Sequence, residues 1–316
     1  MILCINANAA LDNILFIDRF RSGETMRPIR EAMGVGGKGL DSALVLRTLG
    51  APVRAVSFAA GRNGQTLADL LRERDVPVEF IWVPGETRVA NVIVETDFNH
   101  HSHITTSGYT VHAQDCETFK QVISELAQQA SWAIIGGTLP GGAPVSLYRE
   151  IISLLHQLQV PVLIDCSGQP NLAALAARPE IVKMNQDEFS HTFQNRPLSM
   201  VGWLGAAREV MRRFNLHNFV LTCGRKGLLA ITPQAAYLAS APQLQEVNAA
   251  GSGDAVSSAL TYRLSLGESW EAALRWAVAA GAAAVLTEGT AECRLSDVER
   301  IYAESSVRIV EEIRRG

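Results

Sequence analysis

The sequence is poor in cysteine and never pairs two cysteines at a metal-binding spacing. Its 316 residues include five cysteines: Cys4, Cys116, Cys166, Cys223 and Cys293. The absence of a C-x-x-C pair argues against a zinc site, and the scattered cysteines do not form the dense framework of a small disulfide-bonded domain. We therefore expect a protein of the reducing cytoplasm.

Long apolar runs and an early basic region are also missing. The most apolar stretch, residues 277–286, is far shorter than the roughly 20 residues that span a bilayer. No lysine or arginine precedes Arg19, so the start lacks the charged region of a secretory signal peptide. We expect neither export nor a membrane partner.

Positive charge is not in excess. The chain has 28 Lys and Arg residues against 32 Asp and Glu residues, which gives a formal net charge of −4. No basic stripe stands out along the sequence, so nucleic acid is not an expected partner. Small anions would have to be bound by local features.

The sequence does contain repeated alternation of apolar strands with helical segments. Strands are predicted near residues 2–6, 53–59, 132–137, 160–166 and 219–224, and helices near 40–50, 65–74, 116–130, 146–159 and 206–214. Alternation of this kind is typical of a parallel sheet with right-handed crossovers. With 47% hydrophobic residues, we predict one doubly wound α/β core with helices on both faces.

Two segments interrupt this alternation. Residues 13–32 and 78–106 show two-residue periodicity without an intervening helix, which is typical of antiparallel strands with one wet face. We interpret them as a small β-sheet lid inserted at one edge. Residues 1–12, 33–77 and 107–316 then form the core.

The first glycine-rich loop spans residues 33–43 and has G-x-G-x-x-G spacing at Gly34, Gly36 and Gly39. A dinucleotide fingerprint needs a core strand before it and an acidic residue about twenty positions on. The preceding residues are charged, and positions 51–68 lack Asp and Glu. It is not a Walker A loop either, because Lys38 precedes Gly39 instead of Ser or Thr. A tight turn remains one interpretation; the other is that Lys38 binds a phosphate or a sugar hydroxyl.

The second glycine cluster spans residues 248–255, directly before a predicted helix. Glycines at 251 and 253 let backbone N–H groups converge where the helix dipole favours an anion. Asp254 lies in the first helical turn, where it is either a helix-capping residue or a general base beside a transferring phosphoryl group.

Nine segments in order resemble the PfkB, or ribokinase-like, carbohydrate kinases, and specifically the branch of 1-phosphofructokinase and tagatose-6-phosphate kinase. They are NAALD (8–12), GETMR (23–27), GGKGLDSALVLRTLG (36–50), TRVAN (87–91), GGTLPGG (136–142), LIDCSG (163–168), VKMNQDE (182–188), TCGRKG (222–227) and VNAAGSGDA (247–255). The resemblance implies a ribokinase-like fold and transfer of phosphate from ATP, with Mg²⁺, to a hydroxyl of a sugar or sugar phosphate.

The resemblance also implies roles for individual residues. Asp254 would be the base, with an anion hole at Gly251, Ser252 and Gly253. The implied nucleotide contacts are Lys183, Asn185, Gly224 and Gly227, and Glu188 would help to place Mg²⁺ through water. The implied acceptor contacts are Asp12, Gly37, Lys38, Asp41, Arg88 and Thr138, with Arg27 as a further cation from the lid.

Some positions depart from that branch. Position 41 is usually Asn there, and an amide can donate to a hydroxyl, whereas an ionised Asp41 only accepts. Two alternatives therefore stay open: a kinase of an unphosphorylated sugar or nucleoside, and a non-catalytic sugar-phosphate sensor. Pairing of two lids in a homodimer is also expected, because it would cover an exposed sheet.

Overall fold

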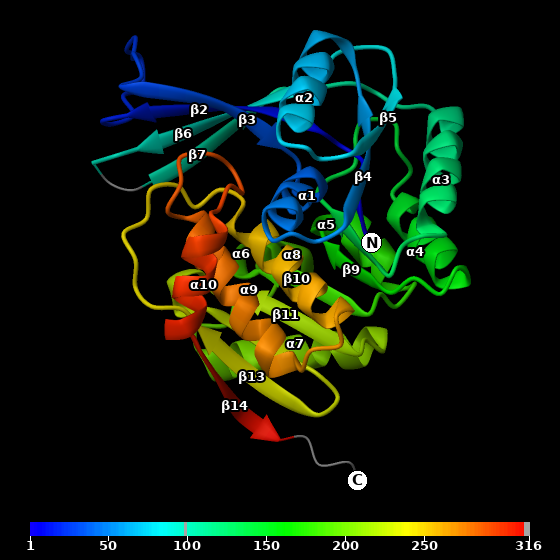
Figure 1. Cartoon of the computed structure of the whole chain (residues 1–316), viewed down its shortest axis with the longest axis vertical. Helices are drawn as coiled ribbons and strands as arrows, with labels where there is room; N and C mark the ends of the chain where they lie inside the picture. The colour runs from blue at the N-terminus through cyan, green and yellow to red at the C-terminus, as the bar shows by residue number, and fades with distance from the viewer. Residues whose placement is uncertain (98–99, 313–316) are drawn as a thin grey trace.

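The predicted alternation builds one ten-stranded sheet in the computed structural model, which describes residues 1–97 and 100–312 (Figure 1). The strand order is β14-β13-β12-β11-β10-β9-β8-β1-β4-β5. The strands are β1 (Ile2–Asn6), β4 (Val53–Ala59), β5 (Val78–Trp82), β8 (Trp132–Gly136), β9 (Val162–Asp165), β10 (Ile181–Asn185), β11 (Asn218–Thr222), β12 (Leu228–Ile231), β13 (Ala235–Ser240) and β14 (Ser306–Glu312). Adjacent strands run parallel across the sheet from β11 through β10, β9, β8, β1 and β4 to β5. Strands β12, β13 and β14 extend the other edge as antiparallel strands.

Helices cover both faces of this sheet, as predicted. They are α1 (Lys38–Thr48), α2 (Gly61–Glu73), α3 (Ala113–Ala127), α4 (Leu147–Gln157), α5 (Gly168–Leu175), α6 (Gln186–Phe193), α7 (Met200–Phe214), α8 (Ser252–Ser265), α9 (Trp270–Ala284) and α10 (Leu295–Glu304). Strand β1 shows why the strands read as continuous apolar runs. Leu3 and Ile5 pack in the cluster that includes α3, α4 and α7, whereas Ile2 and Cys4 pack in the cluster with α1, α2, α8 and α9.

A separate four-stranded sheet, the lid, projects from one end of the core (Figure 1). Its strands, in order across the sheet, are β3 (Arg30–Gly36), β2 (Ala10–Ile17), β6 (Arg88–Glu95) and β7 (His100–Thr105). One face carries a small apolar cluster of Ile14, Phe16, Val92 and Val94. The existence of the small sheet therefore agrees with the sequence prediction.

The boundaries and the pairing of the lid differ from the prediction. Residues 78–82 form β5, which pairs parallel with β4 at the edge of the large sheet because α2 provides a crossover before it. Strand β2 starts at Ala10 and β3 ends at Gly36, so both reach into segments that were assigned to the core. The lid is also a mixed sheet, since β2 and β6 run parallel.

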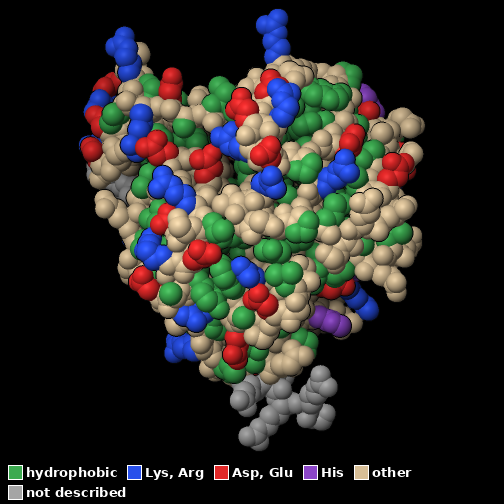
Figure 2. Space-filling model, viewed as in Figure 1, with side chains coloured by type: hydrophobic (Ala, Val, Ile, Leu, Met, Phe, Trp, Pro, Cys, Tyr) green, Lys and Arg blue, Asp and Glu red, His purple; other side chains and the backbone are tan. Residues whose placement is uncertain are grey.

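The surface carries no large patch of one charge on the face seen in Figure 2, where acidic and basic side chains are interspersed. None of the helices in the described ranges has both the length and the apolar character needed to cross a bilayer.

Candidate functional site

The candidate site residues gather where the parallel strands end. Asn6 ends β1, Gly136 ends β8, Asp165 ends β9 and Asn185 ends β10. The N-termini of α1, α6 and α8 begin at the same edge (Figure 1). In open α/β sheets this edge is where ligands bind, because loops and helix N-termini leave a crevice there.

Asp165 is the centre of a buried ion-pair network. Its Oδ1 lies 2.7 Å from Lys38 Nζ and its Oδ2 lies 2.7 Å from Lys183 Nζ. Ser257 Oγ donates a 3.0 Å hydrogen bond to Oδ2. Burial alone would raise the pKa of Asp165, but the two ammonium groups outweigh it and lower the pKa to about 2. Asp165 was not predicted as a site residue; its place at the end of a buried strand is the signal that would have found it.

Glu188 brings a second carboxylate to the same lysine. Asn185 caps α6 by accepting from Glu188 N at 2.8 Å, and Glu188 Oε2 accepts from Asn185 N at 2.8 Å. This capping box fixes the N-x-x-E segment and leaves Glu188 Oε1 to accept from Lys38 Nζ. Burial opposes the charged form of Lys38, but Asp165, then Glu188 and Asp254, raise its pKa well above the ordinary value.

The glycines around Lys38 allow the start of α1 to approach β1. Gly37 has φ +114°, and a Cβ there would lie 2.7 Å from Asn6 Oδ1. A Cβ on Gly39 would lie 2.6 Å from the carbonyl oxygen of Ile5. The strand before this loop, β3, lies in the lid and not in the core sheet, so the loop lacks the preceding core strand of a dinucleotide fingerprint, as the sequence indicated. The loop therefore delivers Lys38 to Asp165 and Glu188.

The N-terminus of α8 faces Lys183. Gly251 has φ +78°, and a Cβ on it would lie 2.2 Å from the backbone nitrogen of Ala291. A Cβ on Gly253 would lie 2.6 Å from Lys183 Nζ. Only glycine lets the loop and the ammonium group come this close, and Ser252 lies between these two positions.

Asp254 is buried in the first turn of α8, with 6% of its surface exposed. Its Oδ1 has no hydrogen-bond partner among the described residues, and Gly251, not Asp254, is the N-cap of α8. Burial and then Asp165 raise the pKa of Asp254 to about 7, while Lys38 and Lys183 act in the opposite direction. A carboxylate of this kind is suited to accept a proton near neutral pH.

A second group of polar residues lies on the lid side of Asp254. Asp12 and Asp41 are buried, and Asp41 Oδ1 is without a partner in the described part of the chain. Burial, then Asp254 and Asp12, raise the pKa of Asp41 well above its ordinary value. Arg88, whose guanidinium donates to the Asn8 carbonyl at 3.1 Å, lowers the pKa of both Asp12 and Asp41.

Thr138 lies near this group, whereas Arg27 does not. Thr138 Oγ1 accepts from Asn8 Nδ2 at 3.0 Å, and Asn8 also binds Arg88. Arg27 is exposed in the loop between β2 and β3 at the far end of the lid. The fold thus brings Asp12, Asp41, Arg88 and Thr138 together, whereas Lys38 faces Asp165 and Glu188 and Arg27 lies apart.

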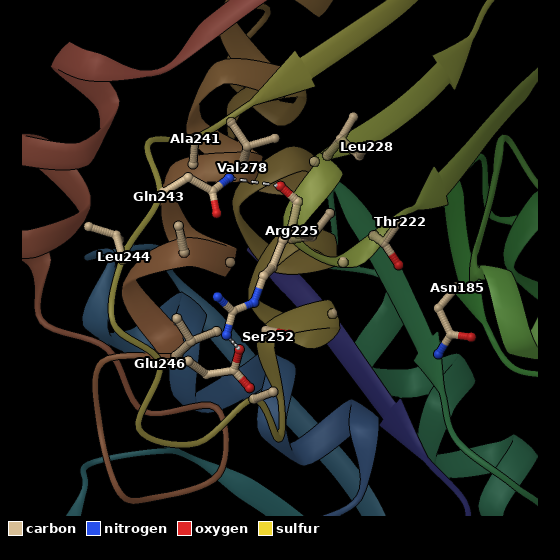
Figure 3. Close-up of a pocket in the computed structure, with 18 of the residues that line it drawn as sticks. Asn185, Thr222, Arg225, Leu228, Ala241, Gln243, Leu244, Glu246, Ser252 and Val278 are labelled. Atoms are coloured by element: carbon tan, nitrogen blue, oxygen red, sulfur yellow. Dashed lines mark hydrogen bonds and ion pairs between the residues drawn. The ribbon is translucent and has the colours of Figure 1, made fainter. Parts of the chain in front are cut away.

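A cavity of about 420 Å³ opens on the other side of the Gly251–Gly253 loop (Figure 3). Its lining includes Lys183, Asn185, Gly224, Gly227, Ser252 and Gly253 together with the apolar Leu228, Val256, Val278 and Val285. Gly227 has φ +88°, and a Cβ there would lie 2.0 Å from the Ala239 carbonyl, so this turn needs glycine. Arg225 and Glu246 form a 3.1 Å ion pair beside the cavity, as Figure 3 shows.

Glu246 also connects this cavity to the lid. Its Oε1 lies 3.4 Å from Nε2 of His101 on β7, and both side chains are mostly buried. Lys183 both lines the cavity and pairs with Asp165, so the cavity borders the ion-pair network.

Comparison with known proteins gives a consistent picture. A model of the pfkB family of carbohydrate kinases matches residues 3–297. The chain is 28% identical over 301 residues to ATP-dependent 6-phosphofructokinase isozyme 2 of Mycobacterium tuberculosis, covering 95% of this chain and 88% of that protein. It is 27% identical over 294 residues to 1-phosphofructokinase of Bacillus subtilis, covering 92% and 95%. A crystal structure of phosphofructokinase-2 from Escherichia coli in complex with substrates and products superposes with TM-score 0.88 at 25% identity, covering 96% of this chain and 98% of that chain.

Proposed function

Because the chain belongs to the pfkB family of carbohydrate kinases, we propose that it transfers the γ-phosphoryl group of ATP to a hydroxyl of a ketohexose phosphate. The resemblance noted in the sequence and the ribokinase-like α/β fold are both confirmed. The named relatives are phosphofructokinases, so the enzyme is an ATP-dependent phosphotransferase that acts on a sugar phosphate. Fructose 6-phosphate, fructose 1-phosphate and tagatose 6-phosphate are the acceptors to test.

The observation that carries this proposal is the position of Asp254. Its buried carboxylate has a pKa of about 7 and lies one residue after Gly253, which faces Lys183 Nζ. In the proposed step Asp254 takes the proton of the acceptor hydroxyl, whose oxygen forms a bond to the γ-phosphorus. The bond between that phosphorus and the β–γ bridging oxygen breaks, and ADP leaves with its electron pair. A sensor would have no need for such a base.

The charges that develop in this step have partners in the site. The Gly253 N–H lies in the first turn of α8, where backbone N–H groups lack intrahelical acceptors, and the Ser252 N–H donates to the Ala249 carbonyl at a long 3.3 Å. With Gly251 these two residues form the proposed anion hole. Lys183 adds a fixed positive charge beside Gly253. The nucleotide would occupy the 420 Å³ cavity, with Asn185 near its phosphates and the Gly224–Gly227 turn along its base and ribose.

The carboxylates that meet Lys38 suit Mg²⁺. Asp165 and Glu188 supply carboxylate oxygens, which are the ligands that Mg²⁺ prefers. The Lys38 ammonium group already lies between these two carboxylates. We propose that Glu188, through water, and Asp165 help to hold the ion. Mg²⁺ bound to ATP would neutralise part of the phosphate charge.

The acceptor would lie between Asp254 and the lid. Asp12 and Asp41 are positioned to accept from sugar hydroxyls, and Arg88 is the nearby cation for a phosphate. Thr138 and Gly37 line the same side of the site. The five cysteines are free and buried, which supports our placing this activity in the reducing cytoplasm.

Two lids also have a surface suited to pairing. Met33, Asn13, Asn91 and Ile104 form one row across the sheet, and the apolar side chains at its two ends are about half exposed. A homodimer through this face would cover them and bring Arg27 of one copy near the other. Sedimentation of the wild type and of Ile104→Lys tests this: the wild type should sediment as a dimer and the variant as a monomer.

The decisive experiment for the function is a coupled assay of ADP release. The acceptors are fructose 1-phosphate, fructose 6-phosphate, tagatose 6-phosphate, fructose, ribose and adenosine, each with ATP and Mg²⁺. A ketohexose phosphate should give the highest kcat/KM. Preference for an unphosphorylated sugar or a nucleoside would overturn the acceptor class, and binding without ADP release would indicate a sensor.

A further inference from the structure

Asp12 receives a hydrogen bond from a residue that is distant in sequence. Thr290 lies in the loop between α9 and α10, is 7% exposed, and donates from Oγ1 to Asp12 Oδ2 at 2.7 Å. On the other side, a Cβ on Gly36 would lie 2.0 Å from Asp12 Oδ1, so the β3 backbone is packed against this carboxylate. The orientation of Asp12 is therefore fixed from two directions.

The loop that carries Thr290 also forms one wall of the proposed anion hole. Ala291 N donates to the Ala250 carbonyl at 3.1 Å, and Asn248 Nδ2 donates to the Glu288 carbonyl at 2.8 Å. The backbone of Ala291 is also the group that leaves no room for a side chain at Gly251. Thr290 thus joins the lid carboxylate to the loop that precedes α8.

The loop between α9 and α10 also makes a weaker contact with the lid. Arg30 of β3 and Glu288 form a 2.8 Å ion pair, but both side chains are about half exposed. Exposed pairs contribute little to stability. The buried hydrogen bond of Thr290 is therefore the contact that fixes Asp12 to the loop.

This hydrogen bond also affects the charge of Asp12. The charged groups that face Asp12 are Arg88 from β6 and Asp41 from α1. Burial raises the pKa of Asp12 to about 6, while Thr290 and Arg88 lower it. Loss of the Thr290 hydroxyl would raise the pKa further, so less Asp12 would be ionised at neutral pH.

We propose that Thr290 is a positioning residue for the acceptor, which holds Asp12 oriented and ionised so that it accepts from a sugar hydroxyl. This inference rests on the proposed kinase function and extends it to a residue outside the glycine-rich motifs. The neighbouring residue Ala291 contacts the proposed anion hole. The acceptor site and the anion hole are therefore both supported by the loop that carries Thr290 and Ala291.

The test compares Thr290→Val with Thr290→Ser. Acceptor binding is measured by calorimetry without ATP at pH 6.5, 7.5 and 8.5, using whichever of fructose 1-phosphate and fructose 6-phosphate the wild type turns over faster. We expect Thr290→Val to raise the acceptor Kd about tenfold or more at pH 6.5, as for loss of a hydrogen bond to a charged group. The difference should shrink at pH 8.5, where Asp12 is ionised in both proteins. Thr290→Ser should stay near the wild type, and the Kd for ATP should be unchanged.

Thr287→Val is the matched control in the same loop. Its hydroxyl donates to the carbonyls of Ala284 and Glu292 and not to Asp12, so its acceptor Kd should stay near the wild-type value at every pH. An equal loss in both valine variants, or a loss in Thr290→Val that does not vary with pH, would overturn the inference in favour of a structural loop contact. An active wild type with an unaffected Thr290→Val would overturn it too. A wild type that phosphorylates no acceptor would instead defeat the proposed function.

Discussion

Lys183 and Asp165 form a buried ion pair, with Nζ 2.7 Å from Oδ2 and side-chain exposures of 2% and 1%. Lys38 binds the other oxygen of the same carboxylate. Removing one member of a buried network leaves uncompensated charge, which is costly in a site closed to water. Asp165 therefore has a structural role in addition to any role in catalysis.

The first prediction concerns Asp165→Asn. We expect the free energy of unfolding, measured in urea at pH 7, to fall by about 3–5 kcal/mol because two ammonium groups lose their shared counter-ion. Asp69→Asn is the control: Asp69 pairs with Arg72 at 2.8 Å on the surface, and its loss should cost less than about 1 kcal/mol. Equal losses in the free energy of unfolding for the two substitutions would show that the buried network stabilises the fold no more than a surface ion pair does.

Acid titration of stability gives a second test of the same carboxylate. The pKa of Asp165 is about 2 in the folded chain, below its ordinary value of 3.8. Its contribution is thus complete above about pH 4 and is lost as the pH falls toward 2. The wild type should lose more stability than Asp165→Asn over this interval, as measured by urea midpoints; parallel curves would contradict the lowered pKa.

The third prediction concerns Asp254→Asn. Turnover should fall at least about 100-fold because the amide cannot take the proton, while the Kd for ATP should stay close to the wild-type value.

The same substitution should also change stability. Because burial raises the pKa of Asp254 to about 7, ionisation of this group opposes folding as the pH rises from 4 to 7. The variant should therefore unfold at a higher temperature than the wild type at pH 8.

Two outcomes would count against this role of Asp254. Retention of more than about a tenth of kcat would exclude an essential base. A lower unfolding temperature of the variant at pH 8 would contradict the raised pKa. The wild-type rate should also fall as the pH drops below 7, since protonated Asp254 is not a base.

Sequence patterns predicted the core better than the edges of the lid. Strands such as β1 are buried on both faces, so their apolar runs were unambiguous. Strand β5 has only partly buried and exposed residues, and its alternation resembled that of a lid strand. Its pairing with β4 is decided by the crossover through α2, which a local pattern does not contain.

The site residues divide in the same way. Asp254 and the glycines near it were predictable because their spacing before a helix has a direct chemical meaning. Asp165 and Thr290 act through partners 18 to 278 residues away. The end of a buried strand is the one local signal for Asp165, and no local pattern marks Thr290. The structure also places Lys38 against Asp165 and Glu188, whereas its position in the loop alone suggested only a phosphate or a hydroxyl.

The fourth prediction tests whether Lys38 serves the acceptor or the nucleotide. Lys38→Ala should raise the acceptor KM or lower kcat while leaving the Kd for ATP nearly unchanged, if its main contact during the reaction is the acceptor. Calorimetry with ATP and initial rates with varied acceptor separate the two cases. Loss of ATP affinity alone would assign Lys38, with Asp165 and Glu188, to the nucleotide side.

The last prediction concerns Asp41, whose Oδ1 is buried without a partner in the described ranges. Burial, then Asp254 and Asp12, raise its pKa and favour its neutral form. If it accepts a hydrogen bond from a sugar hydroxyl once the acceptor is bound, Asp41→Asn removes a charge-assisted bond worth roughly 1.5–3 kcal/mol. The kcat/KM for the preferred sugar phosphate should then fall about 10- to 100-fold, and the loss should grow with pH as more wild-type Asp41 is ionised.

If Asp41 acts mainly as a repulsive charge, the substitution Asp41→Asn should raise kcat/KM for a sugar phosphate instead of lowering it. An acceptor phosphate near Asp41 would be bound better by Asp41→Asn, while unphosphorylated sugars would gain nothing. We expect the loss and not the gain, because an unpartnered buried oxygen is costly unless a ligand satisfies it. Initial rates with fructose 1-phosphate, fructose 6-phosphate and fructose, each at pH 6.5 and 8.5, distinguish the two. Improved kcat/KM for every sugar phosphate would overturn the hydroxyl contact and indicate an unphosphorylated natural acceptor.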